Sequence, residues 1–161
     1  MTEQEPAVPE ESHGVNVPVA VASVCLVTAT LLPIFLFLPS LWREGHIPNP
    51  ILLGSLIPPG LVLIGFIKGQ RLAWQWGRIG GLLGGGLYAL TALGLYLGSA
   101  HTVAAVLMLE SLLLFIMFDA LGRDSARAYF QLNCPECGSR KTKAANFFYT
   151  KSVCKQCDTK W

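Results

Sequence analysis

The stretch IGGLLGGGLYALTALGLYLGSAHTVAAVLMLESLLLFIMF, Ile79–Phe118, consists of two long apolar runs joined by a few small or polar residues. The runs are Ile79–Leu97 and Thr102–Phe118, and Glu110 is the only acidic or basic residue in either of them. A membrane-spanning helix requires roughly 20 predominantly apolar residues, with a range of about 17–25. Because the Gly98–His101 connection is so short, this stretch predicts two spans that form an antiparallel helical hairpin.

Two further apolar runs, Val17–Leu41 and Ile51–Ile67, precede this hairpin. The chain of 161 residues is 52% hydrophobic and only 14% charged, whereas a soluble domain carries about 25% charged residues. The sequence therefore predicts an all-α polytopic membrane protein, with the lipid bilayer around it and four transmembrane helices within residues 17–121. The expected helices are 17–41, 51–67, 79–97 and 102–121.

The N-terminal residues, MTEQEPAVPEESHG, are acidic and include no lysine or arginine. A secretory signal peptide begins with a basic segment and has a shorter apolar region than the first run found here. We therefore expect residues 1–16 to form a disordered acidic tail and the first run to be retained as a helix.

Basic residues are distributed unevenly among the segments that flank the four runs. Eleven of the twelve lysines and arginines lie in the Lys68–Arg78 segment or after the fourth run, and the remaining one is Arg43. With four spans, the N-terminus, the Lys68–Arg78 segment and the C-terminal tail share one side of the membrane. Cytoplasmic loops carry the excess of Lys and Arg, so both termini are predicted to be cytoplasmic, in a cell or inner membrane.

Four cysteines follow the last apolar run as two pairs, CPEC and CKQC, with the spacing C-x2-C-x16-C-x2-C. This spacing is typical of zinc sites, in which two CxxC turns supply the four corners of a tetrahedron. The reducing cytoplasm favours metal binding over a disulfide for such cysteines. We expect one structural zinc ion; a redox-active dithiol pair and a rubredoxin-like iron site are the alternatives. The predicted ligands are Cys134, Cys137, Cys154 and Cys157.

The residues around the cysteines resemble a zinc ribbon. CPECGS, at 134–139, resembles the first knuckle, and TKSVCKQCDTKW, at 150–161, resembles the second strand and knuckle. The segment is similar to the ribbons of transcript-cleavage and RNA-polymerase factors. This resemblance implies a small antiparallel sheet of three strands, pinned by the zinc, with Trp161 packed on it. Asp158 stands where a glycine is usual, and no acidic pair lies between the two knuckles, so transcript-cleavage activity is not expected.

The segment between the knuckles combines basic with aromatic side chains. The simplest interpretation is that the aromatic residues form the core of the ribbon and the basic residues keep it soluble. The alternatives are that this segment contacts a protein partner, anionic lipid below the membrane or nucleic acid. Nucleic acid is the least favoured of the three. The basic residues are Arg140, Lys141, Lys143 and Lys151, and the aromatic residues are Phe147, Phe148 and Tyr149.

Glu110 lies deep within the fourth run. An acidic residue at the centre of a span costs about 2.5–3.5 kcal/mol on insertion, and an ionisable residue at that depth is a functional candidate. The alternative is a neutral carboxyl group that is hydrogen-bonded to a neighbouring helix. Counting outward from the Gly98–His101 turn places Glu110 level with Tyr88, which we expect to be its hydrogen-bond partner.

Two further patterns concern the packing of the spans. Small residues recur every four positions along the third run, and such a ridge lets helices approach closely, either within one chain or in a homo-oligomer. The tandem prolines Pro58 and Pro59, in the middle of the second run, remove backbone donors and are expected to break or kink that helix. The ridge comprises Gly77, Gly81, Gly85 and Ala89.

Residues 122–133 are predicted to link the membrane domain to the ribbon at 134–161, partly by extending the fourth helix. Four thiolates leave no open position on a zinc ion, so we expect no enzymatic activity. The preferred function is an adaptor or scaffold whose ribbon docks a cytoplasmic protein at the membrane. The alternatives are a small transporter or channel component that uses Glu110 and the Pro58–Pro59 break, and a membrane-tethered redox subunit.

Overall fold

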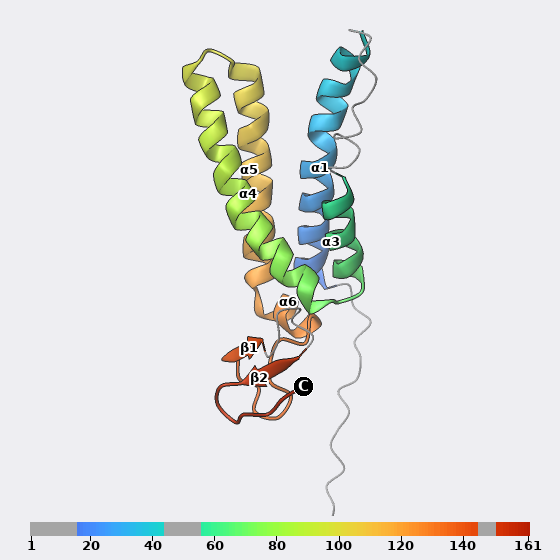
Figure 1. Ribbon diagram of the computed structural model, residues 1–161, viewed down its shortest axis with the longest axis vertical. Coiled ribbons are helices and arrows are strands. Elements are labelled where there is room, and N and C mark those ends of the chain that lie inside the picture. Colours follow the sequence, from blue (N-terminus) through green and yellow to red (C-terminus); the bar gives the residue numbers. More distant parts are fainter. Residues whose placement is uncertain (1–15, 44–55, 145–150) are drawn as a thin grey trace, which may run out of the picture.

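A computed structural model of the chain describes residues 16–43, 56–144 and 151–161, except for the side chains of 37–43 and of residue 144. Its elements are mostly helical (Figure 1). In chain order they are α1 (Val17–Arg43), α3 (Ile57–Ile67), α4 (Arg71–Leu97), α5 (His101–Gly122), α6 (Asp124–Tyr129), β1 (Thr142–Ala144) and β2 (Ser152–Cys154).

Three of the described helices, α1, α4 and α5, are long and apolar enough to cross a membrane. They correspond to the first, third and fourth predicted spans. Helix α3 has only 11 residues, and residues 51–55 of the second apolar run lie outside the described part of the chain. The largely helical fold, with several helices that could span a membrane, is thus confirmed, whereas the second predicted span is not.

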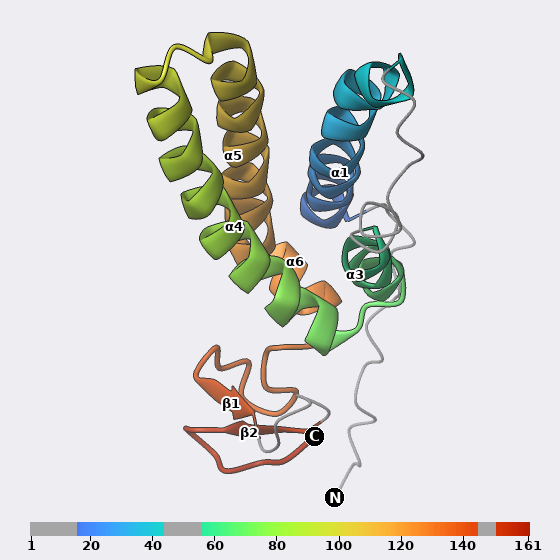
Figure 2. The same cartoon turned by 45° about the horizontal axis from the view of Figure 1, so that its top comes forward.

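Helices α4 and α5 form the predicted antiparallel hairpin (Figure 2), and glycines of α4 lie at the contact between them. A Cβ atom added at Gly81 would lie 2.9 Å from the carbonyl oxygen of Leu114. At Gly85 the close approach lets the Ser111 hydroxyl donate a hydrogen bond of 2.8 Å to the Gly85 carbonyl oxygen. Gly81 and Gly85 of the ridge therefore pack against α5 within the same chain.

Helix α1 packs against α5 and α3 near the end of the bundle that carries the ribbon, and it diverges from the α4–α5 hairpin toward the other end (Figure 1). Its contact face is made of small and medium side chains, which permit close packing. Cys25 is part of this face and is buried. The other buried residues of the face are Val19, Ala22, Leu26 and Ala29.

Part of the segment predicted as a linker, residues 122–133, packs against the bundle. Helix α5 ends at Gly122, Arg123 is extended with a ψ of 152°, and the separate helix α6 follows. Phe130 and Leu132 are fully buried in the same hydrophobic core as the long helices. Phe130 meets Phe66 of α3 edge to face, with 6.0 Å between ring centroids. Helix α5 ends one residue beyond the predicted bound of 121 and does not extend further toward the ribbon, since Phe130 and Leu132 pack against the bundle instead.

Contacts with α6 bring several distant segments to the ribbon end of the bundle. The Asn16 side chain donates a 2.8 Å hydrogen bond to the Ser125 carbonyl oxygen, so the start of α1 lies beside α6. The Tyr129 hydroxyl donates a 2.9 Å bond to the Ile67 carbonyl oxygen in the turn between α3 and α4. The start of α1, this turn and the end of α5 therefore share one end of the molecule (Figure 1).

Candidate metal centre

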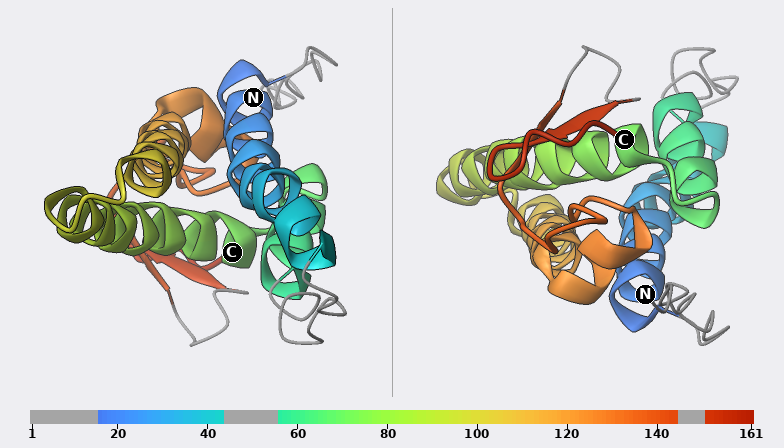
Figure 3. Two further views of the ribbon diagram at one scale, coloured as in Figure 1. Left: turned by 90° about the horizontal axis from the view of Figure 1, so that it is seen from above. Right: turned by 90° about the horizontal axis from the view of Figure 1, so that it is seen from below.

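The four cysteines of the candidate metal centre lie in and beside a small sheet formed by β1 and β2. The strands pair antiparallel, with Thr142 opposite Cys154, and Lys160 adds a single bridge to Val153. Within the described residues the sheet has two strands and this bridge, whereas the ribbon resemblance implies three strands. The view from below shows the sheet lying over the first turns of α4 (Figure 3).

Each CxxC pair forms a tight turn, and the two turns have the same pattern of main-chain bonds. The amide of Cys134 donates to the Ser139 carbonyl oxygen at 3.1 Å, and the amide of Cys154 donates to that of Thr159 at 2.9 Å. The residue after each second cysteine has a left-handed backbone, with φ of +65° at Gly138 and +56° at Asp158. An aspartate adopts this conformation more readily than most residues with a side chain. The aspartate in the second knuckle therefore preserves the turn.

The two turns bring the four predicted ligands together. The sulfur atoms of Cys134, Cys137, Cys154 and Cys157 all lie within 4.8 Å of one another, and three of the pairs are separated by 3.5 Å. A disulfide has a sulfur–sulfur distance near 2.05 Å, so these cysteines are unpaired, free thiols. Tetrahedral zinc, with Zn–S bonds of about 2.3 Å, requires sulfur–sulfur distances of about 3.8 Å. The cluster is therefore compact enough to hold one metal ion with four thiolate ligands.

Two of the four thiols, Cys157 and Cys137, differ in how readily they lose their protons. Hydrogen bonds from the Thr159 side chain and backbone lower the pKa of Cys157 to about 6. A backbone hydrogen bond from Ser139 acts to lower the pKa of Cys137, but burial and the neighbouring thiols together raise it to about 12. Crowded thiols cannot all carry a negative charge without a cation. A divalent metal ion would supply the positive charge that lets all four ionise.

The sheet is attached to the membrane helices through Arg71, in the first turn of α4. Its guanidinium donates hydrogen bonds to the Ser152 hydroxyl at 3.1 Å and to the Trp161 carbonyl oxygen at 3.3 Å, and it lies 5.8 Å from the centre of the Trp161 ring. The Trp161 indole in turn donates to the Gln131 carbonyl oxygen at 3.2 Å. The sequence marks Arg71 only as one of the charges in the Lys68–Arg78 segment and gives no sign of this role, because its partners are more than 80 residues away along the chain.

The predicted hydrogen bond between Glu110 and Tyr88 is not formed. Glu110 is 2% exposed and its Oε1 is buried without a hydrogen-bond partner among the described residues, whereas Tyr88 is 37% exposed. The polar contact between the two helices is made by Ser111, which directly follows Glu110.

The tandem prolines stand at the start of a described helix. Pro58 and Pro59 occupy the first turn of α3, which begins at Ile57. Backbone amides in the first turn of a helix have no acceptor within that helix, so a proline there removes no helical hydrogen bond. Within the described part of the chain, the prolines therefore lie in the first turn of α3. The predicted break would expose carbonyl groups of residues 51–55, which lie outside the described part.

Comparisons of the chain with protein-family models, with curated proteins and with solved structures found no match.

Proposed function

We propose that the chain is a non-enzymatic membrane-anchored adaptor, whose zinc-bound ribbon presents a basic surface to a cytoplasmic protein. The observation that carries this proposal is the cluster of four thiols held directly against the ends of the membrane helices. A zinc ion with four thiolate ligands has no open position for a substrate, so its role is to stabilise the ribbon.

The attachment through Arg71 supports a docking role because it limits the orientations of the ribbon relative to the bundle. A surface held in a fixed orientation loses less freedom when it binds a partner than a module on a flexible tether does. The predicted linker is packed into the core, which has the same effect. The ribbon is thus a rigid extension of the membrane domain.

The charge of the ribbon indicates the kind of partner. Residues 134–161 include six basic and two acidic side chains. Several of the lysines are exposed, and complementary potentials steer and orient association. A partner with an acidic surface fits this charge. The exposed lysines include Lys141, Lys143 and Lys155, and the test below uses Lys141 and Lys155.

The cytoplasmic location rests on the positive-inside rule. Eleven of the twelve lysines and arginines lie in the turn that precedes α4, in the first turns of α4 or after the fourth apolar run. These segments lie at or near the ribbon end of the molecule (Figure 1). We therefore assign the ribbon end to the cytoplasm.

The test combines metal analysis with affinity capture from membranes in mild detergent. For the native chain we expect about one zinc ion and one defined set of captured proteins. The double substitution Cys137→Ser with Cys157→Ser should remove both. Lys141→Glu with Lys155→Glu should retain zinc but lose the captured proteins. Lys68→Glu is the matched control, because Lys68 is an exposed lysine outside the ribbon. Capture that is unchanged by the loss of zinc and by charge reversal would rule out the adaptor function.

A transporter or channel component is the second candidate, and the buried Glu110 is the observation that favours it. Its Oε1 has no hydrogen-bond partner among the described residues, and intramembrane acids mark ion and proton pathways. Proteoliposomes with an internal pH or cation indicator test this candidate. Flux that Glu110→Gln abolishes would support transport, and the absence of flux above that of empty liposomes would reject it.

A further inference from the structure

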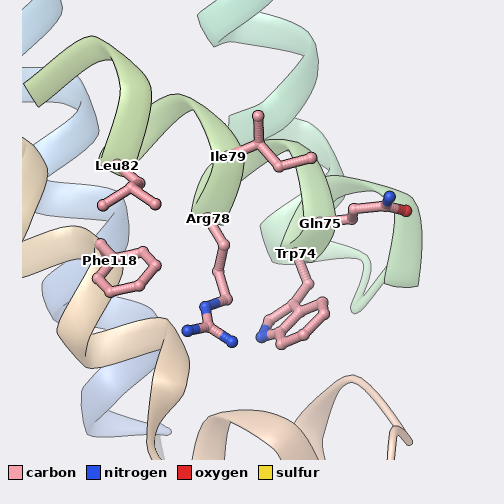
Figure 4. Close-up of a pocket in the computed structure, with 6 residues that line it drawn as sticks. All are labelled: Trp74, Gln75, Arg78, Ile79, Leu82 and Phe118. Atoms are coloured by element: carbon pink, nitrogen blue, oxygen red, sulfur yellow. The ribbon is translucent and has the colours of Figure 1, made fainter. Parts of the chain in front are cut away.

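A pocket opens on the side of the α4–α5 hairpin near its ribbon end, with a volume of about 250 Å³ (Figure 4). Arg78 extends into it, with its guanidinium between Trp74 and Phe118. The guanidinium carbon lies 4.6 Å from the centre of the Phe118 ring and 5.3 Å from that of Trp74. The pocket thus combines one positive charge with aromatic walls. Its lining residues are Trp74, Gln75, Arg78, Ile79, Leu82 and Phe118.

The charge of Arg78 is not neutralised within the described part of the chain. Its Nε is buried and has no hydrogen-bond partner there. The two ion pairs of the described residues join Arg123 to Asp119 and Arg140 to Asp124, so neither involves Arg78. A buried polar group without a partner is destabilising, and more so when it is charged. The pocket therefore favours a ligand that brings negative charge.

Arg127, from α6, adds a second positive charge beside the same tryptophan. Its guanidinium carbon lies 5.8 Å from the centre of the Trp74 ring, and its Nε is also buried without a hydrogen-bond partner. The positive charges of Arg127 and Arg78 act on each other. Arg127 Nη2 donates a hydrogen bond of 3.2 Å to the Arg140 carbonyl oxygen, but neither Arg127 nor Arg78 has an ion-pair partner among the described residues.

The end of α5 offers only partial compensation. A Cβ atom added at Gly122 would lie 3.8 Å from the terminal Nη2 of Arg78, so the guanidinium is close to the C-terminus of that helix. A helix C-terminus carries the equivalent of about half a negative charge. This is enough to orient one arginine but not to neutralise two.

The position of the pocket along the helices corresponds to the membrane surface. Arg78 directly precedes the apolar run Ile79–Leu97, and Phe118 is the last residue before Asp119. At 1.5 Å per residue, this run spans about the 30 Å thickness of the hydrocarbon core. The guanidinium therefore lies at the level of the lipid headgroups. Trp74 is fixed there by a 2.8 Å hydrogen bond from its indole to the Leu121 carbonyl oxygen.

The remaining walls of the pocket are apolar and lie toward the centre of the bilayer. Ile79 and Leu82 are on α4 beyond Arg78, and they are 40% and 48% exposed. The pocket is therefore amphipathic along the membrane normal, with charge at the headgroup level and hydrocarbon beside the acyl chains. A phospholipid has the same order of charge and hydrocarbon along its length.

We propose that this pocket binds an anionic glycerophospholipid. The headgroup phosphate lies at Arg78, within the field of Arg127, and an acyl chain covers Ile79, Leu82 and Phe118. Basic pockets between membrane helices on the cytoplasmic side are suited to such headgroups. A soluble phosphate offers the same charge but no hydrocarbon to cover the exposed apolar wall, which favours the lipid as the occupant.

Native mass spectrometry of the full chain in detergent tests this proposal, with equal amounts of phosphatidylglycerol and phosphatidylcholine added. We expect one phosphatidylglycerol bound in clear preference to phosphatidylcholine. One arginine near a charged lipid contributes a factor of about five in affinity, so Arg78→Gln should weaken phosphatidylglycerol binding about fivefold. Arg123→Gln removes the same charge from an exposed ion pair outside the pocket and should leave binding unchanged.

The hydrocarbon part of the site is tested separately. Leu82→Trp fills the apolar wall while both arginines remain, and it should weaken phosphatidylglycerol binding; Leu83→Trp, at an exposed leucine outside the pocket, should not. Arg78→Lys retains the positive charge. Phosphatidylglycerol binding by Arg78→Lys would show that the loss of binding in Arg78→Gln reflects the lost charge and not misfolding. Equal binding of the two lipids, or equal effects of Arg78→Gln and Arg123→Gln, would overturn the proposal. Displacement by millimolar inorganic phosphate with no effect of Leu82→Trp would assign the pocket to soluble phosphate instead and reject the lipid.

Discussion

Gly138 and Asp158 occupy equivalent positions in the two knuckles of the ribbon. Each follows the second cysteine of a CxxC pair, and each has a left-handed backbone, with φ of +65° and +56°. The two turns thereby place all four sulfur atoms within 4.8 Å of one another. One knuckle uses the residue that tolerates this conformation best, and the other uses an aspartate, which tolerates it less well.

This relationship predicts opposite effects for two substitutions at Asp158. Asp158→Gly should leave metal affinity unchanged or raise it slightly, because glycine adopts positive φ without strain. Asp158→Val should destabilise the metal-bound ribbon by about 1–2 kcal/mol, because a β-branched side chain is a genuine outlier at positive φ. Zinc transfer to a chromogenic chelator measures both effects. Equal affinity of the glycine and valine variants would show that the turn does not require this backbone.

Metal affinity is expected to rise with pH. Cys157, with a pKa near 6, is mostly ionised at pH 7, whereas Cys137, with a pKa near 12, is protonated. Zinc must displace the protons that remain, so raising the pH removes its competitor. Between pH 6.5 and 8 we expect the apparent affinity to increase by about tenfold per pH unit for each displaced proton. Chelator competition at several pH values provides the measurement, and a flat profile would contradict thiolate ligation by these residues.

Two adjacent glycines of α4 provide a matched test of the hairpin contact. Gly81→Ala places a Cβ 2.9 Å from a backbone oxygen of α5, and overpacking of this kind costs about 1–3 kcal/mol. Gly80→Ala meets no atom within 4 Å and should be neutral or stabilise by up to about 1 kcal/mol through helix propensity. Thermal unfolding in detergent compares the two. Similar melting temperatures would argue against the close packing of α4 on α5.

Removal of the Arg71 side chain should loosen the ribbon without removing the metal. Arg71→Ala deletes two hydrogen bonds and the stacking on Trp161, which we expect to cost about 1–2 kcal/mol of docking free energy. Hydrogen exchange in residues 151–161 should become faster while the zinc content stays the same. Arg123→Ala serves as the control, because its exposed ion pair with Asp119 contributes about 0–1 kcal/mol. Unchanged exchange in the Arg71 variant would show that the ribbon is held by other contacts.

Glu110 is expected to reduce the stability of the bundle. Its buried Oε1 has no described hydrogen-bond partner, and such a group costs about 1–3 kcal/mol. Glu110→Met, of similar length, should raise the stability by about that amount, whereas Ser111→Ala should lower it by about 1 kcal/mol, because it removes the bond to Gly85. A lower melting temperature for Glu110→Met would show that the carboxyl group has a stabilising partner.

Several features of this protein could be predicted from the sequence alone. The lengths of the apolar runs predicted the α4–α5 hairpin and α1, and the CxxC spacing predicted the four clustered cysteines. These are local properties, since about 20 apolar residues must form a helix to satisfy their backbone in lipid, and a CxxC turn aims two sulfur atoms at one point. The length of an apolar run did not decide whether the second run forms a full span, because it does not specify the residue at which a helix begins.

The tertiary structure decided everything that depends on how the helices rotate and where the chain turns back. It placed Ser111, and not Tyr88, in the polar contact between α4 and α5, packed residues 122–133 into the core, and joined Arg71 to the ribbon. It also brought Arg127 beside Trp74, the same ring that Arg78 stacks on. Each of these relationships joins side chains that are distant along the chain or depends on a rotation about a helix axis. Sequence spacing specifies neither of these, because both are set by how the whole core packs.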